Sequence, residues 1–241
     1  MSIWTRITEA LSALAKGEGL GAVFDRLRQP PERSVAFTIA VIALSAKMAK
    51  ADGQVTRNEV AAFREIFSIA PEDEKAAARV FNLARQEGRA APGAAPRRRR
   101  GGGGGGELPR RIRRMFDDTK GPVCDLLEGL FYIAMADGHY HPAEEAFLDR
   151  VAEIFEIPAA EYRAVRARFV PDAVPDPYAV LGVDPATPLP EIRSHWRQLV
   201  RDSHPDVMQA RGVPPEAVKL SEKRLIDINR AWEEISAQRA A

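Results

Sequence analysis

The sequence predicts an all-α protein in which a duplicated helical bundle is followed by a small helical hairpin. Three observations support this fold class. Apolar residues recur at helical spacing in most segments, and a short pattern ending in Asp-Gly occurs twice, 85 residues apart. Near the end of the chain, a proline-containing bend separates two amphipathic segments. The 241 residues suffice for one sizeable domain and one small domain, which we place at residues 1–170 and 171–241.

The first residues carry apolar side chains at helical spacing. We expect this segment to pack against the bundle that follows. The alternative, a helix that lies on a membrane surface, is less favoured because the segment has few cations. The apolar positions are Ile3, Trp4, Ile7, Leu11 and Leu14.

The duplicated pattern covers residues 46–66 and 132–151. Each copy contains an apolar helix, an Asp-Gly turn and a second amphipathic helix. One copy alone would leave an apolar face uncovered, so we expect the two copies to pack together. Gly53 and Gly138 should end the first helix of each copy in a left-handed conformation.

The acidic residues beside these turns allow two interpretations. A hard cation would need about six oxygen ligands, which neither turn supplies, and the spacing is not that of an EF-hand. Helix capping explains more: Thr56 and Glu59 fit a capping box, and Pro142 fits a first helical turn. We therefore expect no metal and no cofactor. The carboxylates that a cation site would use are Asp52, Glu59, Asp137 and Glu144.

An arginine- and glycine-rich stretch, residues 88–109, separates the two copies. It contains Arg97–Arg100 and six successive glycines, so we expect a disordered tether inserted into the bundle. The arginines could bind phosphates of RNA or of acidic lipids, but no interleaved aromatic residues offer base stacking. A solvated linker is the favoured interpretation. Four further arginines follow the stretch: Arg110, Arg111, Arg113 and Arg114.

Residues 176–237 have the pattern of three helices. Asp176 and Pro177 form a start signal for the first helix, and Gly182 provides its stop. The second and third helices, at 191–202 and 216–237, carry matching apolar stripes and should pack antiparallel across a loop. The stripe residues are Ile192, Trp196, Leu199, Val200, Leu225, Ile228, Trp232 and Ile235.

The tripeptide His204-Pro205-Asp206 follows the second helix. Pro205 lacks a backbone donor and disfavours helix at the residue before it, so the helix should stop near His204. The imidazole and the carboxylate would then be exposed at a tight bend. A cationic stripe with a spacing of four residues lies beside it: Arg193, Arg197 and Arg201. The alternatives are a simple capping turn and a solvated helix face.

These motifs resemble the J-domain of the DnaJ family, the co-chaperones of DnaK-type chaperones. The resemblance covers residues 176–237, and the bundle before it resembles the TerB-like domain of the DjlA branch. The matching segments, in order, are Asp176–Val183, Glu191–Arg193, Trp196–Leu199, His204–Asp206 and Ile228–Trp232.

The resemblance implies a docking protein and not an enzyme. The expected partner is a DnaK-type chaperone of the 70-kDa heat-shock class, whose ATP hydrolysis and capture of unfolded or specific clients the chain would stimulate. The tripeptide would make the docking contact, and the three stripe arginines would face an acidic surface of the partner. The alternative function is an anionic-surface or nucleic-acid binder acting through the arginine-rich linker, although nucleic acid is not the expected partner.

Composition and segment lengths agree with this expectation. The formal net charge of +1 provides no general attraction to polyanions. Cys124, the single cysteine, excludes an internal disulfide and a cysteine-built zinc module. The most apolar stretch, residues 35–46, is shorter than the roughly 20 residues of a membrane span, and the first residues do not resemble a signal peptide. Membrane-anchored DjlA proteins carry a spanning segment that this sequence lacks, so we expect a cytoplasmic location.

Four positions depart from the J-domain pattern. Val207 stands where a basic residue usually follows the tripeptide, and Ser203 stands where an aromatic residue often precedes the histidine. Asp202 and Gln198 replace cations. These changes weaken the positive stripe.

Overall fold

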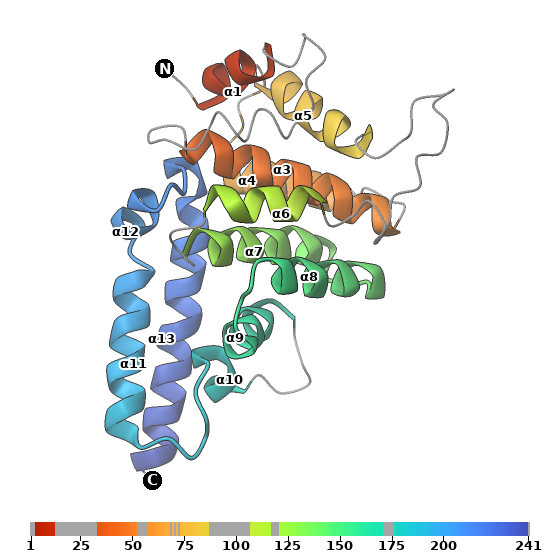
Figure 1. The fold of residues 1–241 in the computed structure, drawn as a ribbon. Helices are drawn as coiled ribbons and strands as arrows, with labels where there is room; N and C mark the ends of the chain where they lie inside the picture. Colours follow the sequence, from red (N-terminus) through yellow and green to blue (C-terminus); the bar gives the residue numbers. More distant parts are fainter. Residues whose placement is uncertain are drawn as a thin grey trace.

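A computed structural model describes residues 3–12, 33–52, 57–67, 69, 71, 73–86, 107–116, 121–170 and 176–240. Every regular element within these ranges is a helix, and the predicted all-α class is confirmed (Figure 1). The elements form two groups, which we call the bundle and the hairpin unit.

The bundle contains the helices up to residue 169. They are α1 (Ile3–Ser12), α3 (Arg33–Asp52), α4 (Arg57–Phe67), α5 (Glu74–Gln86), α6 (Glu107–Met115), α7 (Gly121–Ala134), the 3-10 turn η2 (Met135–Asp137), α8 (Pro142–Ile154) and α9 (Ala159–Phe169). The hairpin unit contains α10 (Pro177–Leu181), α11 (Leu189–Asp202), α12 (Pro205–Ala210), the 3-10 turn η3 (Pro215–Ala217) and α13 (Val218–Ala240).

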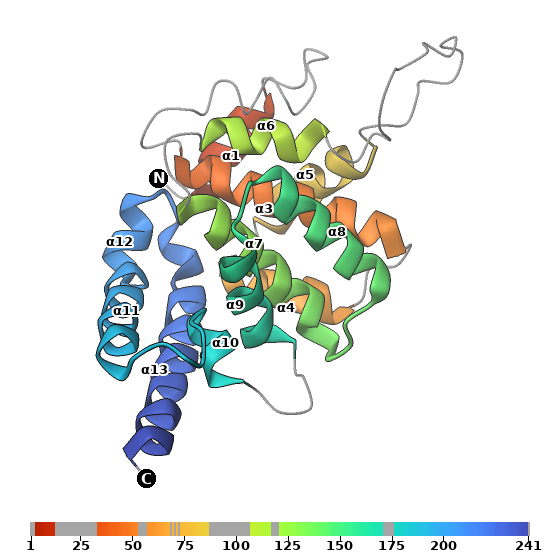
Figure 2. The same cartoon turned by 60° about the horizontal axis from the view of Figure 1, so that its bottom comes forward.

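The two predicted helix pairs are α3 with α4 and α7 with α8. Helix α3 contacts α5, α7 and α8, and it runs through the interior of the bundle in Figure 2. Gly138 has φ 81° and ends the α7–η2 segment in the left-handed region, as predicted. Gly53 and Thr56, the corresponding positions of the first copy, lie outside the described residues.

Helix α1 packs onto α3 and α5 through its apolar face. Ile3, Trp4 and Ile7 are buried, which confirms the predicted packing against the bundle for these three positions. Leu14 and the side chain of Leu11 lie outside the described part of the chain. None of the described helices combines the length and the apolar character that crossing a membrane requires.

The end of the arginine- and glycine-rich stretch differs from the prediction. Helix α6 begins at Glu107, and Leu108 and Pro109 are buried against the bundle, so these three residues are not part of a tether. The pattern Leu108, Ile112, Met115 places one apolar face inward, which stabilises the helix. The preceding residues 88–106, including Arg97–Arg100, lie outside the described residues.

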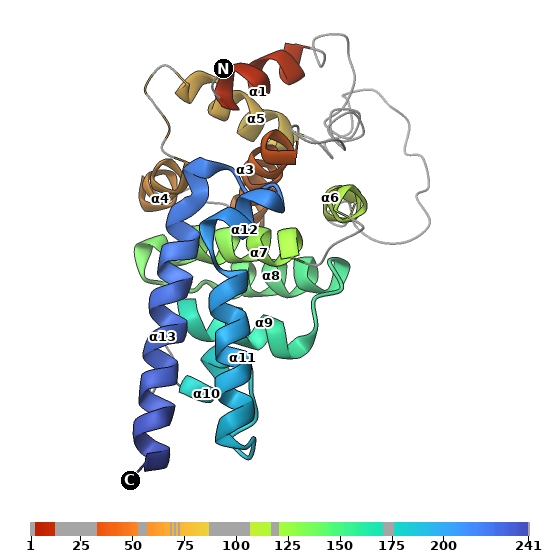
Figure 3. The same cartoon turned by 90° about the vertical axis from the view of Figure 1, so that its left-hand side faces the viewer.

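The hairpin unit follows the predicted pattern with one difference. Helices α11 and α13 pack side by side and antiparallel (Figures 1 and 3), and Figure 1 shows α11 on the side of α13 that faces away from the bundle. The segment predicted as a loop contains the short helix α12, because Pro205 occupies its first turn and His204 supplies its N-cap.

Two apolar cores hold these elements. A small core lies between α10, α11 and α13 and includes Leu181, Ile192 and Ile228. The large core fills the bundle and also takes in four residues of the hairpin unit: Met208, Val213, Ala217 and Leu220. Helix α12 and the start of α13 are therefore built into the bundle.

Candidate docking site

The bend after α11 presents the tripeptide to solvent. Ser203 is buried and donates its hydroxyl hydrogen to the carbonyl oxygen of Leu199 at 2.7 Å, which closes the last turn of α11. The backbone N–H of Asp206 donates to Nδ1 of His204 at 3.2 Å. Helix α12 thus begins with a capping contact made by the tripeptide itself.

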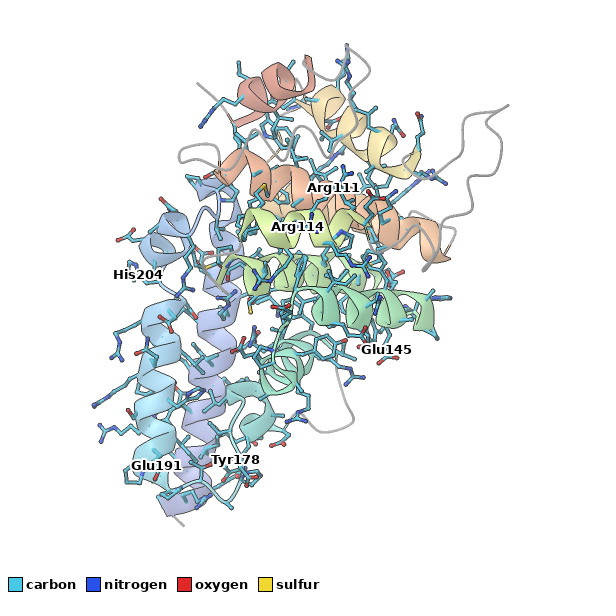
Figure 4. All side chains as sticks on the ribbon, in the orientation of Figure 1. Arg111, Arg114, Glu145, Tyr178, Glu191 and His204 are labelled. Carbon is cyan, nitrogen blue, oxygen red and sulfur yellow. The ribbon has the colours of Figure 1, made fainter. Side chains whose placement is uncertain are left out.

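This cap leaves Nε2 of His204 free, while Oδ2 of Asp206 lies 3.6 Å from Nδ1 of the same ring. Since Nδ1 of His204 accepts a hydrogen bond, the proton of the neutral ring lies on Nε2, which is available as a donor. The side chains of His204 and Asp206 are 58% and 86% exposed. Figure 4 shows His204 at the outer side of the molecule, at the junction of α11 and α12. The predicted exposure of the two side chains is confirmed.

Asp202 and Arg211 fix the far side of the bend. A guanidinium nitrogen of Arg211 lies 3.3 Å from the Asp202 carboxylate, and the two residues join the end of α11 to the end of α12. The Arg211 side chain also packs on Gly121, where an added Cβ would approach it to 2.7 Å. Asp202, a departure from the J-domain pattern, therefore has a structural partner here.

The cationic stripe lies on the exposed face of α11. Arg193 and Arg197 are exposed and form no ion pair with another described residue. Arg201 is also exposed but donates to the Gln198 side chain at 2.6 Å, and Gln198 in turn donates to Asp202 at 3.0 Å. Two of the three stripe arginines, Arg193 and Arg197, are therefore free, whereas Arg201 is hydrogen-bonded to a side chain of its own helix.

Two tryptophans join α11 to α13. The rings of Trp196 and Trp232 stack with centroids 5.2 Å apart and an interplanar angle of 14°. The indole N–H of Trp196 donates to the Asn229 side chain at 3.0 Å. Both rings are half-buried and pack against the small core, which agrees with their predicted place on the apolar stripes.

Sequence reasoning missed two residues that brace the hairpin unit. A ring nitrogen of His195 lies 2.9 Å from the carbonyl oxygen of Leu181, which links α11 to α10. Arg239 donates to the Tyr178 hydroxyl at 3.1 Å and lies over its ring. Helix α13 ends at Ala240, beyond the predicted end at Ala237, and Arg239 lies in this additional part.

A buried polar cluster, also missed by sequence reasoning, joins the hairpin unit to the bundle. We call it the charge clamp, and it consists of Asp125 and Glu128 of α7, Arg168 of α9 and Arg224 of α13. Arg224 donates to Asp125 at 2.6 Å and also to Glu128. Arg168 lies 3.3 Å from Glu128, and both carboxylate side chains are 1% exposed. The signal in the sequence is two acids, three positions apart, within the otherwise apolar segment 121–134.

Burial and pairing act on these carboxyl groups in opposite directions. Burial raises the pKa of Asp125, and the attraction of Arg224 only partly offsets this. Burial also acts to raise the pKa of Glu128, but Arg224 and Arg168 together lower it below the ordinary value. Glu128 is therefore the carboxylate that the two guanidinium groups hold in its charged form.

The carboxylates considered as metal ligands take part in caps at the second repeat. Asp137 accepts the backbone N–H of His139 at 2.9 Å. Glu144 accepts the backbone N–H of His141 at 3.0 Å, and Nδ1 of His141 accepts that of Ala143, which is a capping box. In the first repeat, Glu59 is buried and the Asp52 side chain lies outside the described residues. Within the ranges that the structure describes, no three His, Cys, Asp or Glu side chains cluster as metal ligands would.

The arginines that follow the insertion lie on helix α6. Arg110, Arg111 and Arg114 are exposed, and Figure 4 shows Arg111 and Arg114 on this helix. Arg111 pairs with Glu107 at 2.9 Å, and Arg113 lies 3.4 Å from Glu156. The four arginines that follow the predicted linker therefore belong to an ordered helix with a basic face.

Comparison with known proteins identifies the bundle. The model of the family described as tellurite resistance protein TerB matches residues 38–167, more than half of the 241 residues. The chain belongs to this family. No solved structure matches it.

Relatives named co-chaperone protein DjlA align with most of the chain. The Escherichia coli (strain K12) protein is 23% identical over 283 residues, covering 99% of this chain and 99% of the relative. The Photobacterium profundum protein is 22% identical over 250 residues, covering 93% and 85%. The Shewanella oneidensis protein is 25% identical over 240 residues, covering 93% and 86%. The predicted resemblance to the DjlA branch is confirmed, and these names support a co-chaperone role and favour a protein that is not an enzyme.

Proposed function

We propose that residues 171–241 are a J-domain and that the chain docks onto a DnaK-type chaperone and stimulates its ATP hydrolysis and client capture. The observation that carries this proposal is the bend, where the exposed His204 and Asp206 side chains stand at the end of a helix with two free arginines. A cytoplasmic chaperone is the natural partner, so we place the hairpin unit in the cytoplasm.

The contact would form in two stages. Arg193 and Arg197 would meet an acidic surface of the chaperone, where complementary charge accelerates encounter and fixes the register of docking. Asp206 would then accept from a basic group of the partner, while Nε2 of His204 donates to an acceptor there. Pro205 contributes by fixing φ at the start of α12, so little conformational freedom is lost on docking.

Steady-state ATP turnover of the cognate chaperone tests the proposal. The parent chain should stimulate turnover, and His204→Gln should stimulate it little or not at all, because the bend loses its cap and its ring donor. His139→Gln is the matched control: His139 is an exposed histidine at the turn of the second repeat. Stimulation by His204→Gln equal to that by the parent would contradict the proposed site.

A second candidate function uses the basic face of α6. Three exposed arginines, of which Arg110 and Arg114 have no partner among the described residues, offer contacts to phosphate groups of an anionic surface. The double substitution Arg110→Glu/Arg114→Glu should abolish co-sedimentation with vesicles that contain phosphatidylserine and leave ATPase stimulation intact. If unsubstituted protein does not co-sediment at low salt, this second function is wrong.

A further inference from the structure

The charge clamp lies where α13 passes from one core to the other. Before Arg224, Ala217 and Leu220 are buried in the large core of the bundle. After it, Ile228 and Ile235 are buried in the small core of the hairpin unit. Arg224 is therefore the point at which the last helix leaves the bundle.

Beyond this point a cleft separates α13 from the bundle. It has a volume of about 800 Å³ and lies between α4, η2 and the end of α9 on one side and α10 and α13 on the other. Residues from both sides line it, including Glu65, Met135, Phe169, Asp227 and Arg230. The second half of α13 is thus held to the bundle less closely than the first half.

Contacts near the clamp connect it to the docking bend. Helix α12, which begins at the tripeptide, buries Met208 in the large core, and Val213 and Ala217 continue this contact into α13. The orientation of the bend relative to the bundle therefore depends on how α12 and the first turns of α13 pack against the large core.

We propose that Arg224 is a positioning residue that fixes the docking bend in one orientation relative to the bundle. A charged clamp suits this role better than an apolar contact does. If α13 moved by one turn, about 5.4 Å, the buried Asp125 would lose Arg224, and Glu128 would keep only Arg168 of its two partners; an uncompensated buried charge is costly. Apolar surfaces tolerate such a shift more readily, because the hydrophobic effect is not directional. The importance of this orientation for activity rests on the proposed function.

The test needs a variant that removes the clamp without leaving a charge unpaired. Arg224→Met alone would strand Asp125 in the interior. The double substitution Asp125→Asn/Arg224→Met removes one charge of each sign and leaves Glu128 with Arg168, 3.3 Å away. This variant should remain folded, with an unchanged midpoint of urea unfolding.

The direct measurement is the distance distribution between two spin labels on the full chain. Labels at Glu191, at the start of α11, and at Ala146 on α8 replace exposed residues in a Cys124→Ser background. The parent should give one narrow distribution, and Asp125→Asn/Arg224→Met should lose it in favour of a broad one. Equal widths in two equally stable proteins would overturn the proposal.

Measurements of chaperone stimulation and of further variants separate this proposal from the proposed function. The chaperone should need about fivefold more of the double variant for half-maximal stimulation, which is within the usual range for coupled sites, and the maximal rate should stay the same.

Arg224→Lys keeps the charge but not the fork geometry of the guanidinium group. Its distance distribution should be narrower than that of the double variant and broader than that of the parent. Should the double variant fail to fold, Arg224→Lys carries the distance test alone, and a distribution as narrow as the parent's would refute the role of the fork. A failure of His204→Gln to lower stimulation would reject the proposed function and leave the distance result standing.

Discussion

At the scale of single residues, the docking surface depends on which polar atoms are already paired. His204 accepts at Nδ1 and keeps Nε2 free, whereas Arg201 is held by Gln198. The sequence predicts the tripeptide and the four-residue spacing of the arginines, because both follow from helix geometry and proline chemistry. It cannot predict that Arg201 is paired, since a side-chain hydrogen bond along a helix depends on rotamers.

This difference gives a prediction about the stripe. Arg197→Glu should weaken association with the chaperone by about tenfold or more at low salt and flatten its salt dependence, because a free cation becomes a repelling charge. Arg201→Glu should have a smaller effect. Association rates measured by stopped-flow fluorescence at several salt concentrations give the comparison, and equal losses for the two variants would place Arg201 fully in the docking surface.

At the scale of elements, capping residues in the sequence predict the helix boundaries well. Asp176, Gly182 and Gly138 mark helix boundaries where they were predicted, because caps depend on local backbone chemistry. The predicted tether extends three residues too far, because residues 107–109 follow the glycines directly and yet belong to helix α6. Their helix forms through the burial of Leu108 and Ile112 against distant helices, which is a tertiary effect.

The glycine at the second repeat turn provides a prediction at this scale. At φ 81° a Cβ on residue 138 would meet no atom within 4 Å, so any cost of substitution comes from the backbone alone. Gly138→Ala should lower the free energy of unfolding by about 1 kcal/mol, and Gly138→Asn by less, because Asn tolerates the left-handed region. Urea unfolding of both variants checks the order, and a larger loss for Asn would contradict it.

At the scale of the whole molecule, the bundle and the hairpin unit are joined through a shared core and a shared set of charges. Sequence reasoning separated them at residue 170 because it treats each amphipathic stripe as a closed unit. The four hairpin-unit residues in the large core and the two partners of Arg224 become visible only when helices far apart in sequence are placed together. The clamp was therefore outside what periodicity alone can predict.

The clamp also predicts a pH dependence of stability. Because the folded-state pKa of Glu128 is lowered, its stabilisation is fully present above the unfolded value of about 4.3 and is lost as pH falls through the folded pKa. Glu128→Gln should cost about 3–5 kcal/mol at neutral pH, and the cost should shrink progressively below about pH 4. The folded-state pKa of Asp125 is raised, so its charge opposes folding at neutral pH, and Asp125→Asn should cost less. Urea unfolding of the three proteins at several pH values is the measurement, and a larger cost for Asp125→Asn would reverse our assignment.

Site-specific photo-crosslinking tests the central claim most directly. A photoreactive residue at Ser194, exposed between Arg193 and Arg197 on α11, should crosslink to the nucleotide-binding domain of the cognate DnaK-type chaperone in the presence of ATP. The same residue at Ala146 on α8, which is also an exposed helical position, should not. A crosslink from position 146 with none from position 194 would show that the chaperone binds another face of the molecule and would contradict the account.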